Sequence, residues 1–178
     1  MADPEIVLFD SVSGYRTTSL QYYSRGFSAV GARKAAGRFN RADVSAVYFA
    51  LEPQTALAEY WGTEPPRPAV VLPAGLTAIR VIDLTVDLSS LSPDWQDWNC
   101  DWKIVRDAEL ASGTPGDCAS WRCGDMAIAA NCSAIMFPSV AHAGGRNVVI
   151  FTESITVGHR IDLLDPFDEI GAANPAKF

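Results

Sequence analysis

Short segments of β-branched and aromatic residues recur along the whole chain, and this pattern restricts the possible folds more than any other feature of the sequence. Gly, Pro, Asp and Ser, which are typical of turns and strand ends, separate the segments. The pattern therefore predicts a sheet of many short strands. We expect these strands at residues 6–9, 15–17, 46–50, 70–72, 78–84, 134–137 and 148–152, with a turn at 143–146 between the last two.

Helices are expected in the connections between some of these strands. Pro53 follows Glu52, and proline is favoured at the first position of a helix, so a helix should begin there and extend past Glu59. Residues 121–132 predict a second helix, whereas the small residues of 28–37 predict an irregular loop or a short helix. Together the elements predict an α+β fold with a mostly antiparallel sheet and connecting helices.

Residues 94–102 contain Trp95, Trp98 and Trp102 among acidic and amide side chains. Such a segment is more often a helix that packs its aromatic face on the core, and this is the preferred interpretation. The alternative is a surface that binds a partner or closes over a cleft. The prolines of residues 65–68 cannot lie inside a helix and predict a connector.

The chain has 178 residues, 48% of them hydrophobic, which suits one domain spanning residues 1–178. It has no apolar run long enough to cross a bilayer, and its first residues lack the basic and apolar regions of a signal peptide. We therefore expect a cytoplasmic protein without a membrane anchor.

The cysteines and histidines do not form a pattern that holds a metal ion. The four cysteines include no CxxC pair, and His142 and His159 lie near no cluster with ligand spacing. Free, buried thiols and no metal site are expected. The sequence also lacks the glycine-rich, P-loop, zinc-protease and serine-hydrolase motifs.

A concentration of positive charge interrupts this acidic chain, whose net charge is −7. Residues 11–42 contain no Asp or Glu but include Arg16, Arg25, Arg33, Lys34, Arg38 and Arg41. This arrangement favours a small anionic ligand over nucleic acid, which would select a basic face or domain. Surface solvation accounts for most of these cations. Arg16 and Arg38 are expected to point inward, because each lies beside an aromatic residue in a strand-like segment.

Arg38, Tyr48 and Glu59 combine a fixed cation, an aromatic face and a single carboxylate. Ordinary glycoside hydrolysis takes two carboxylates, because a poor leaving group must be protonated. The nicotinamide of NAD is already cationic and leaves without protonation, so one carboxylate can stabilise the developing positive charge on the ribose. The three residues therefore point to cleavage of NAD. Ordinary roles, an exposed carboxylate at a helix end for Glu59 and a core residue for Tyr48, are the alternatives.

Several motifs resemble the RES domain, a family named for its Arg, Glu and Ser. The motifs are Gly37-Arg38-Phe39-Asn40, the strand at 47–50, Pro53-x-Thr55-Ala56-Leu57-x-Glu59, Gly124-Asp125, and Phe137-Pro138-Ser139 followed by residues 147–151. The resemblance spans a core of about residues 14–151. Phe39 stands where the family often has Trp, a conservative change between aromatic residues.

The resemblance implies an ADP-ribosyltransferase-like fold that consumes NAD as a substrate and needs no cofactor. It places the family Arg on Arg38, the aromatic on Tyr48, the Glu on Glu59 and the Ser on Ser139. Arg38, Tyr48 and Glu59 become the candidates for catalysis. The candidates for binding NAD are Arg16, Arg38, Tyr48, Ser139 and Asn147. Ser139 and Asn147 are also candidates for orienting Arg38, and ordinary roles as turn and strand-edge residues are their alternatives.

RES proteins act as toxins with a Xre-type antitoxin, so the resemblance also implies a hetero-oligomeric complex with such a partner. The ADP-ribose is expected to pass to water or phosphate. Transfer to a host protein is the close alternative, and a non-catalytic binding module is a further one.

Overall fold

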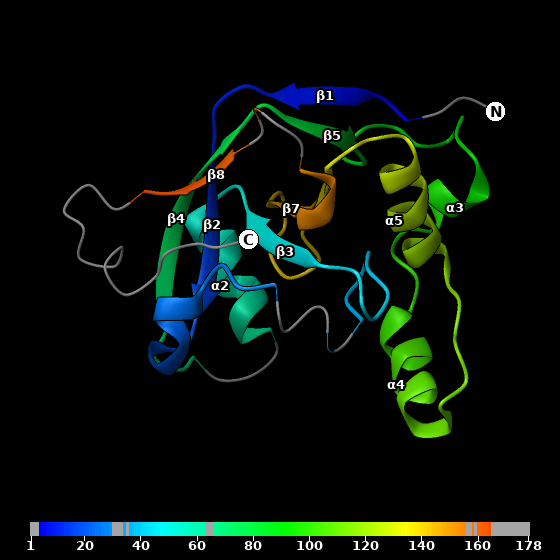
Figure 1. Ribbon diagram of the computed structural model, residues 1–178, viewed down its shortest axis with the longest axis horizontal. Coiled ribbons are helices and arrows are strands. Elements are labelled where there is room, and N and C mark those ends of the chain that lie inside the picture. Colours follow the sequence, from blue (N-terminus) through cyan, green and yellow to red (C-terminus); the bar gives the residue numbers. More distant parts are fainter. Residues whose placement is uncertain are drawn as a thin grey trace.

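One sheet of eight short strands forms the centre of the protein in a computed structural model (Figure 1), which describes residues 4–29, 34, 36–62, 66–155, 158 and 160–164. Along the sheet the strand order is β1-β5-β6-β7-β3-β2-β4-β8. The strands are β1 (Ile6–Phe9), β2 (Val12–Thr18), β3 (Ala46–Ala50), β4 (Val70–Thr77), β5 (Ile79–Asp83), β6 (Ala134–Pro138), β7 (Arg146–Phe151) and β8 (Arg160–Leu163).

Helices lie in the connections between the strands. They are α2 (Pro53–Trp61), α3 (Pro93–Gln96), α4 (Trp102–Ser112) and α5 (Ala119–Ala129), with short 3-10 turns at Leu20–Arg25 and Thr152–Ser154. Neighbouring strands are antiparallel except for β5 and β6, which are parallel. A parallel pair requires a crossover, and α3, α4 and α5 lie within it. The α+β class and the mostly antiparallel sheet are therefore confirmed.

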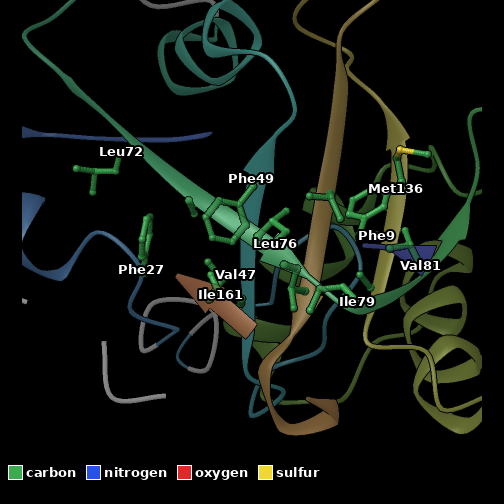
Figure 2. Close-up of a cluster of buried hydrophobic side chains, with 14 residues drawn as sticks. Phe9, Phe27, Val47, Phe49, Leu72, Leu76, Ile79, Val81, Met136 and Ile161 are labelled. Carbon is green, nitrogen blue, oxygen red and sulfur yellow. The ribbon is translucent and has the colours of Figure 1, made fainter. Parts of the chain in front are cut away.

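Hydrophobic side chains cover both faces of the central strands. In β3, Val47 and Phe49 join one buried cluster, shown in Figure 2 with Phe27, Leu72 and Leu76. Ala46 joins a second cluster, in which Phe39, Val149, Phe151, Trp95 and Trp98 are buried. Because adjacent strand residues point to opposite faces, a strand covered on both sides is apolar throughout. Tyr48 is the polar exception in β3 and packs beside the second cluster.

Most predicted strands agree with the structure to within a few residues, and β2 and β4 are longer than expected because they pair along most of their length. The predicted helix after Glu52 is α2, whose first residue is Pro53. The second predicted helix is α5, which begins at Ala119 and ends at Ala129. The predicted turn at 143–146 joins β6 to β7, with Gly144 at a left-handed φ of 78°.

The segment 94–102 is not one helix. Helix α3 ends at Gln96 and α4 begins at Trp102. Trp95 and Trp98 are buried in the second cluster, so core packing is confirmed for them and a surface role for these two is wrong. Helix α4 was not predicted, although its sequence is amphipathic, and it buries none of its residues. Predictions for Arg33, Pro65, His159 and much of 28–37 lie outside the described residues.

No helix among the described residues is long and apolar enough to cross a membrane.

Candidate active site

A cavity of about 420 Å³ opens where β2, β3 and α2 face the start of α4. The predicted residues Arg16, Arg38, Tyr48, Glu59 and Asn147 all line it. Further lining groups are Tyr15, Thr17, Gly37, Phe49, Ala50, Ala56, Tyr60, Trp102, Lys103, Phe137 and Val140. The fold thus brings five of the six candidate residues to one space, and the sixth, Ser139, contacts Glu59 from beside it.

Glu59 is fixed by two hydrogen-bond donors. Ser139 Oγ donates to Glu59 Oε1 at 2.7 Å, and Asn147 Nδ2 donates to the same oxygen at 2.6 Å. No hydrogen bond reaches Oε2 from the described residues. Ser139 and Asn147 thus hold the carboxylate of Glu59. One expectation was that they orient Arg38, and they form no hydrogen bond with it among the described residues. Two donors on one oxygen keep the carboxylate at the cavity wall.

The loop that carries Ser139 is docked on the first turn of α2. Ser139 Oγ accepts hydrogen bonds from the backbone N–H groups of Ala141 and His142, at 3.2 and 3.0 Å. His142 Nδ1 lies 2.7 Å from the buried hydroxyl of Thr55. Gly145 lies so close to Thr55 that a Cβ atom would overlap its hydroxyl. The loop, and with it Ser139, is therefore packed directly against the helix that carries Glu59.

Glu52, just before α2, strengthens the same contact. Its Oε2 accepts from the backbone N–H of Arg146 at 3.0 Å, and its Oε1 accepts from the Arg146 guanidinium at 3.1 and 3.2 Å. Partial burial opposes ionisation of Glu52, but these hydrogen bonds hold its pKa below the usual value.

Arg38 is half-buried and is held by the segment between α3 and α4. Its Nη1 donates to Asn99 Oδ1 at 2.6 Å, and its guanidinium carbon lies 5.6 Å from the centre of the Trp98 ring. Burial lowers the pKa of Arg38 from its ordinary value, while the charge of nearby Glu59 opposes that change. The opposite charges of Arg38 and Glu59 thus interact across the cavity.

Arg16 is the least satisfied cation of the cavity. Its Nη1 is buried and has no hydrogen-bond partner, and the hydroxyl of the adjacent Thr17 is in the same state. Burial lowers the pKa of Arg16 to about 10. A buried guanidinium without a partner is costly, and such groups are usually completed by an anion. The prediction that Arg16 points inward agrees with this geometry.

Tyr48 is held by the loop of the Gly37-Arg38-Phe39-Asn40 motif. Its hydroxyl donates to Asn40 Oδ1 at 2.8 Å and accepts from the backbone N–H of Phe39 at 3.0 Å. Burial raises the pKa of Tyr48 above its ordinary value, so the hydroxyl is neutral near pH 7. A Cβ atom at Gly37 would lie 2.7 Å from this hydroxyl, which explains the need for glycine.

Gly124 and Asp125 on α5 support the same loop. A Cβ atom at Gly124 would overlap the carbonyl oxygen of Phe39, so only glycine lets the helix approach the loop this closely. Asp125 Oδ2 accepts from Arg41 Nε at 3.0 Å, and Asp117 Oδ1 accepts from Arg41 Nη2 at 2.6 Å. The charge of Arg41 is thus paired with Asp125 on α5 and with Asp117 just before that helix, and Arg41 does not line the cavity.

The site also contains residues that the sequence did not suggest. Asn99 and Lys103 come from the crossover between β5 and β6, and no motif marks them. Trp102 comes from the same crossover and lines the cavity, which agrees with the alternative that the tryptophan segment faces a cleft. Asn40 could have been found, because it belongs to the Gly37–Asn40 motif. Among the described residues, no group of three His, Cys, Asp or Glu side chains could hold a metal ion.

Comparisons with known proteins agree with the fold. The chain resembles a solved structure from M. tuberculosis, the crystal structure of the MbcT-MbcA toxin-antitoxin complex, with a TM-score of 0.57 and 18% sequence identity. The match covers 87% of this chain and 82% of that chain, and at this identity it speaks for the fold alone. A comparison with curated protein sequences gives no match. The RES domain matches residues 14–166, which is most of the sequence, and the chain therefore belongs to the RES domain family.

Proposed function

We propose that this protein cleaves the bond between nicotinamide and ribose in NAD. The observation that carries the proposal is a single carboxylate, Glu59, held by two donors in the same cavity as the cations Arg16 and Arg38. Such a cavity suits a substrate with an anionic diphosphate at one end and a bond that breaks to leave positive charge at the other. NAD has both features.

Each group has a distinct part in this proposal. Arg16 and Arg38 bind the diphosphate or the ribose oxygens, because a planar guanidinium offers paired donors to such groups. The Tyr48 ring offers a flat surface for nicotinamide, and its neutral hydroxyl donates a hydrogen bond to Asn40 Oδ1. Glu59 binds a ribose hydroxyl and stabilises the cationic ribose in the transition state. NAD is the substrate in this scheme and no resident cofactor is required.

The acceptor of ADP-ribose depends on what reaches the open face of the ribose. Water or phosphate gives depletion of NAD, and we favour this outcome because it asks for no further recognition surface. Transfer to a host protein uses the same bond cleavage and differs only in the acceptor. A non-catalytic binding module is disfavoured, because it would not need the carboxylate of Glu59 to be fixed by both Ser139 and Asn147.

Membership of the RES domain family and the fold shared with a toxin-antitoxin complex support a biological role as a toxin. We propose that the protein acts in the cytoplasm, where it drains NAD, and that a Xre-type antitoxin blocks its cavity. The contacts of Arg41 with Asp117, just before α5, and with Asp125, on α5, reduce the positive charge that the basic segment offers to such a partner. Trp102, at the cavity wall, is the member of the tryptophan group that an antitoxin could reach.

Substitution of Glu59 by Gln tests the activity. Gln keeps the size of the side chain and removes its charge, so nicotinamide release from labelled NAD should fall about 100-fold or more. Glu5→Gln is the matched control, because Glu5 is exposed and lies outside the cavity. Release of nicotinamide by Glu59→Gln within threefold of the wild type would contradict the assignment.

The toxin role needs a separate experiment. Expression of the protein alone should lower cellular NAD and stop growth, and expression with its antitoxin should restore both. A wild-type protein that turns over NAD in vitro but leaves growth and NAD unchanged at high expression would favour a housekeeping role in NAD metabolism.

A further inference from the structure

Two cysteine side chains meet at the N-terminus of α5, next to the segment that holds Arg38. Cys100 Sγ lies 3.4 Å from Ser120 Oγ, and Cys118 Sγ lies 3.5 Å from the same oxygen. Both sulfur atoms therefore lie beside one hydroxyl oxygen. Cys100 is partly exposed and Cys118 is buried. The pair is 18 residues apart in the chain and takes no part in the proposed cleavage of NAD.

The surroundings of Cys100 favour its thiolate. Its thiol donates to the Ser120 hydroxyl at 3.4 Å, and the backbone N–H groups of Ala119 and Ser120, in the first turn of α5, favour the ionised sulfur. The first turn of a helix carries partial positive charge, and its free N–H groups stabilise an anion there. Burial opposes ionisation of Cys100, but these hydrogen bonds hold its pKa below the usual value.

In the other three cysteines burial outweighs any such stabilisation. Burial raises the pKa of Cys118 and of Cys132, and it raises the pKa of Cys123 to about 12. A partly exposed thiolate beside a buried resolving thiol is the arrangement in which peroxides react selectively.

We propose that Cys100 and Cys118 are a redox-sensitive pair, which hydrogen peroxide or a related hydroperoxide converts into an intramolecular disulfide. The Cys100 thiolate attacks one peroxide oxygen, the O–O bond breaks, and the departing hydroxide takes a proton to become water. Cys100 is then a sulfenic acid. The Cys118 sulfur attacks the Cys100 sulfur, the S–O bond breaks, and the released hydroxide takes the Cys118 proton to form a second water molecule. Two thiols are oxidised and one peroxide is reduced.

The disulfide would change the wall of the cavity. Asn99 directly precedes Cys100, and Asn99 Oδ1 holds Arg38 Nη1 at 2.6 Å. A covalent bond draws the Cys100 sulfur toward Cys118 and away from its present contacts with Ser120. The backbone of Asn99 moves with it, and Arg38 loses its hydrogen-bond partner. This consequence rests on the proposed function of Arg38.

The disulfide can be mapped without measuring activity. Reduced full-length protein is treated with hydrogen peroxide, the remaining thiols are alkylated, and the protein is digested with trypsin. The sequence places Cys100 in the peptide 81–103, Cys118 in the peptide 107–122, and Cys123 with Cys132 in the peptide 123–146. We expect a linked pair of 81–103 and 107–122, lighter than the two reduced peptides by two hydrogen atoms and separated by a thiol reductant.

Variants define the outcomes of the mapping. Cys118→Ser should abolish the linked pair and leave Cys100 as a sulfenic acid that dimedone traps. Cys132 follows the C-terminus of α5, at the other end of that helix from Cys118. Cys132→Ser should therefore give the linked peptides as the wild type does. Alkylation of both Cys100 and Cys118 after peroxide treatment, or linkage through Cys123, would overturn the proposal.

Turnover then tests the link to the cavity. The oxidised wild type should lose about 10-fold or more in kcat/KM for NAD and regain it on reduction, since small displacements of a binding group cost this much. Cys100→Ser should keep its turnover after peroxide treatment. A linked protein with unchanged turnover would overturn the coupling to Arg38. Absence of turnover in the reduced wild type would instead count against the proposed function and would leave the peptide mapping valid.

Discussion

The residues around the cavity are of two kinds: some line it, and others fix the lining residues by hydrogen bonds. Asn99 holds Arg38, Asn40 holds Tyr48, and Ser139 with Asn147 holds Glu59. Arg16 differs from the other candidate residues because its buried Nη1 has no partner. Arg38, Tyr48 and Glu59 are thus fixed by the protein, whereas Arg16 has a free donor. An anionic ligand can accept a hydrogen bond from that donor.

Replacement of Arg16 by Met should therefore raise stability and weaken binding. Met keeps an unbranched stem of similar length and removes an unsatisfied buried cation, which costs about 1–3 kcal/mol. We expect the midpoint of thermal unfolding without ligand to rise by about 2–4 °C or more. The increase in midpoint that NAD causes in the wild type should be reduced, and KM for NAD should increase.

Arg80→Met is the control for this experiment, because Arg80 is exposed on β5 and does not line the cavity. It should change neither the midpoint nor KM appreciably. An Arg16→Met protein that is less stable than the wild type and binds NAD equally well would show that Arg16 serves packing alone.

Gly37 is the second residue at which a small change should have a large effect. A methyl group there would lie 2.5 Å from Asn40 Oδ1 and 2.7 Å from the Tyr48 hydroxyl, so that one of these groups must move. We expect Gly37→Ala to fold but to lose at least about 10-fold in kcat.

Gly75→Ala is the matched control for Gly37→Ala. A methyl group at Gly75 has no contact shorter than 3.5 Å. Circular dichroism checks that both variants fold, and nicotinamide release measures their turnover. Equal turnover of the two variants would show that the Tyr48 hydroxyl needs no fixed position.

The sequence predicts which residue types meet in the cavity better than it predicts their contacts. Arg38, Tyr48 and Glu59 were predicted because their local motifs are recognisable. Asn99 was not, because it lies 61 residues from Arg38 and only the tertiary fold brings the two together. Ser139 and Asn147 were predicted as site residues, but their contact with Glu59 depends on how the β6–β7 loop docks on α2.

At the scale of elements, α5 supports the Gly37–Asn40 loop through charge as well as through the close approach of Gly124. Asp117, just before α5, accepts from Arg41 and from Arg122. The hydrogen bond from Arg41 is the main reason that the pKa of Asp117 is lowered. The ion pairs join the loop that follows Phe39 to the crossover between β5 and β6.

This lowered pKa gives the contact a predictable dependence on pH. A carboxyl whose pKa is lower in the folded than in the unfolded state stabilises the fold above the unfolded value, near 4, and loses that contribution as pH falls through the folded value. Asp117→Asn should therefore lower the unfolding free energy at pH 7 by about 0.5–1 kcal/mol, as exposed ion pairs do. Its difference from the wild type should vanish near pH 2.

Urea denaturation at several pH values measures this difference. Asp10→Asn is the control, because Asp10 is exposed and forms no ion pair among the described residues. A difference between Asp117→Asn and the wild type that stays constant from pH 7 to pH 2 would exclude titration of Asp117 as its cause.

Helix α4 marks the limit of sequence-based prediction at this scale. Its sequence is amphipathic, yet its apolar residues Ile104 and Leu110 are 68% and 67% exposed, so the pattern does not mark a face buried in the core. Its C-terminal signal is clear in retrospect, since Gly113 adopts a left-handed φ of 68°. By contrast, Pro53 at the first helical position predicted α2, and α5 buries Trp121, Cys123 and Ala127.

At the scale of the whole molecule, stability is concentrated in the centre of the sheet. Strands β3, β6 and β7 are covered on both faces and contain several residues with no exposed surface, among them Val47, Ile135, Val148 and Ile150. Helix α4 has no buried residue. The order of strands was not predictable from the sequence, because apolar runs of similar composition can pair in many orders, but the class of fold was.

Native-state hydrogen exchange should reveal this difference. Amides of β3, β6 and β7 should exchange only through global unfolding, whereas those of α4 should exchange through local opening at much lower free energy. Mass spectrometry of exchanged peptides measures both. Equal protection of α4 and β7 would mean that α4 is stabilised by contacts beyond those described.

The parallel pairing of β5 with β6 has a consequence for how this fold can change. The chain between the two strands forms one wall of the cavity through Trp102 and Lys103, while the opposite wall comes from β2, β3 and α2. Insertions or exchanges in that connection leave the strand order intact. The same connection supplies Asn99, which holds Arg38, and Gly124, which packs against the carbonyl of Phe39. An exchange limited to α4 would therefore remodel the wall formed by Trp102 and Lys103 while Arg38 and Glu59 keep their supports.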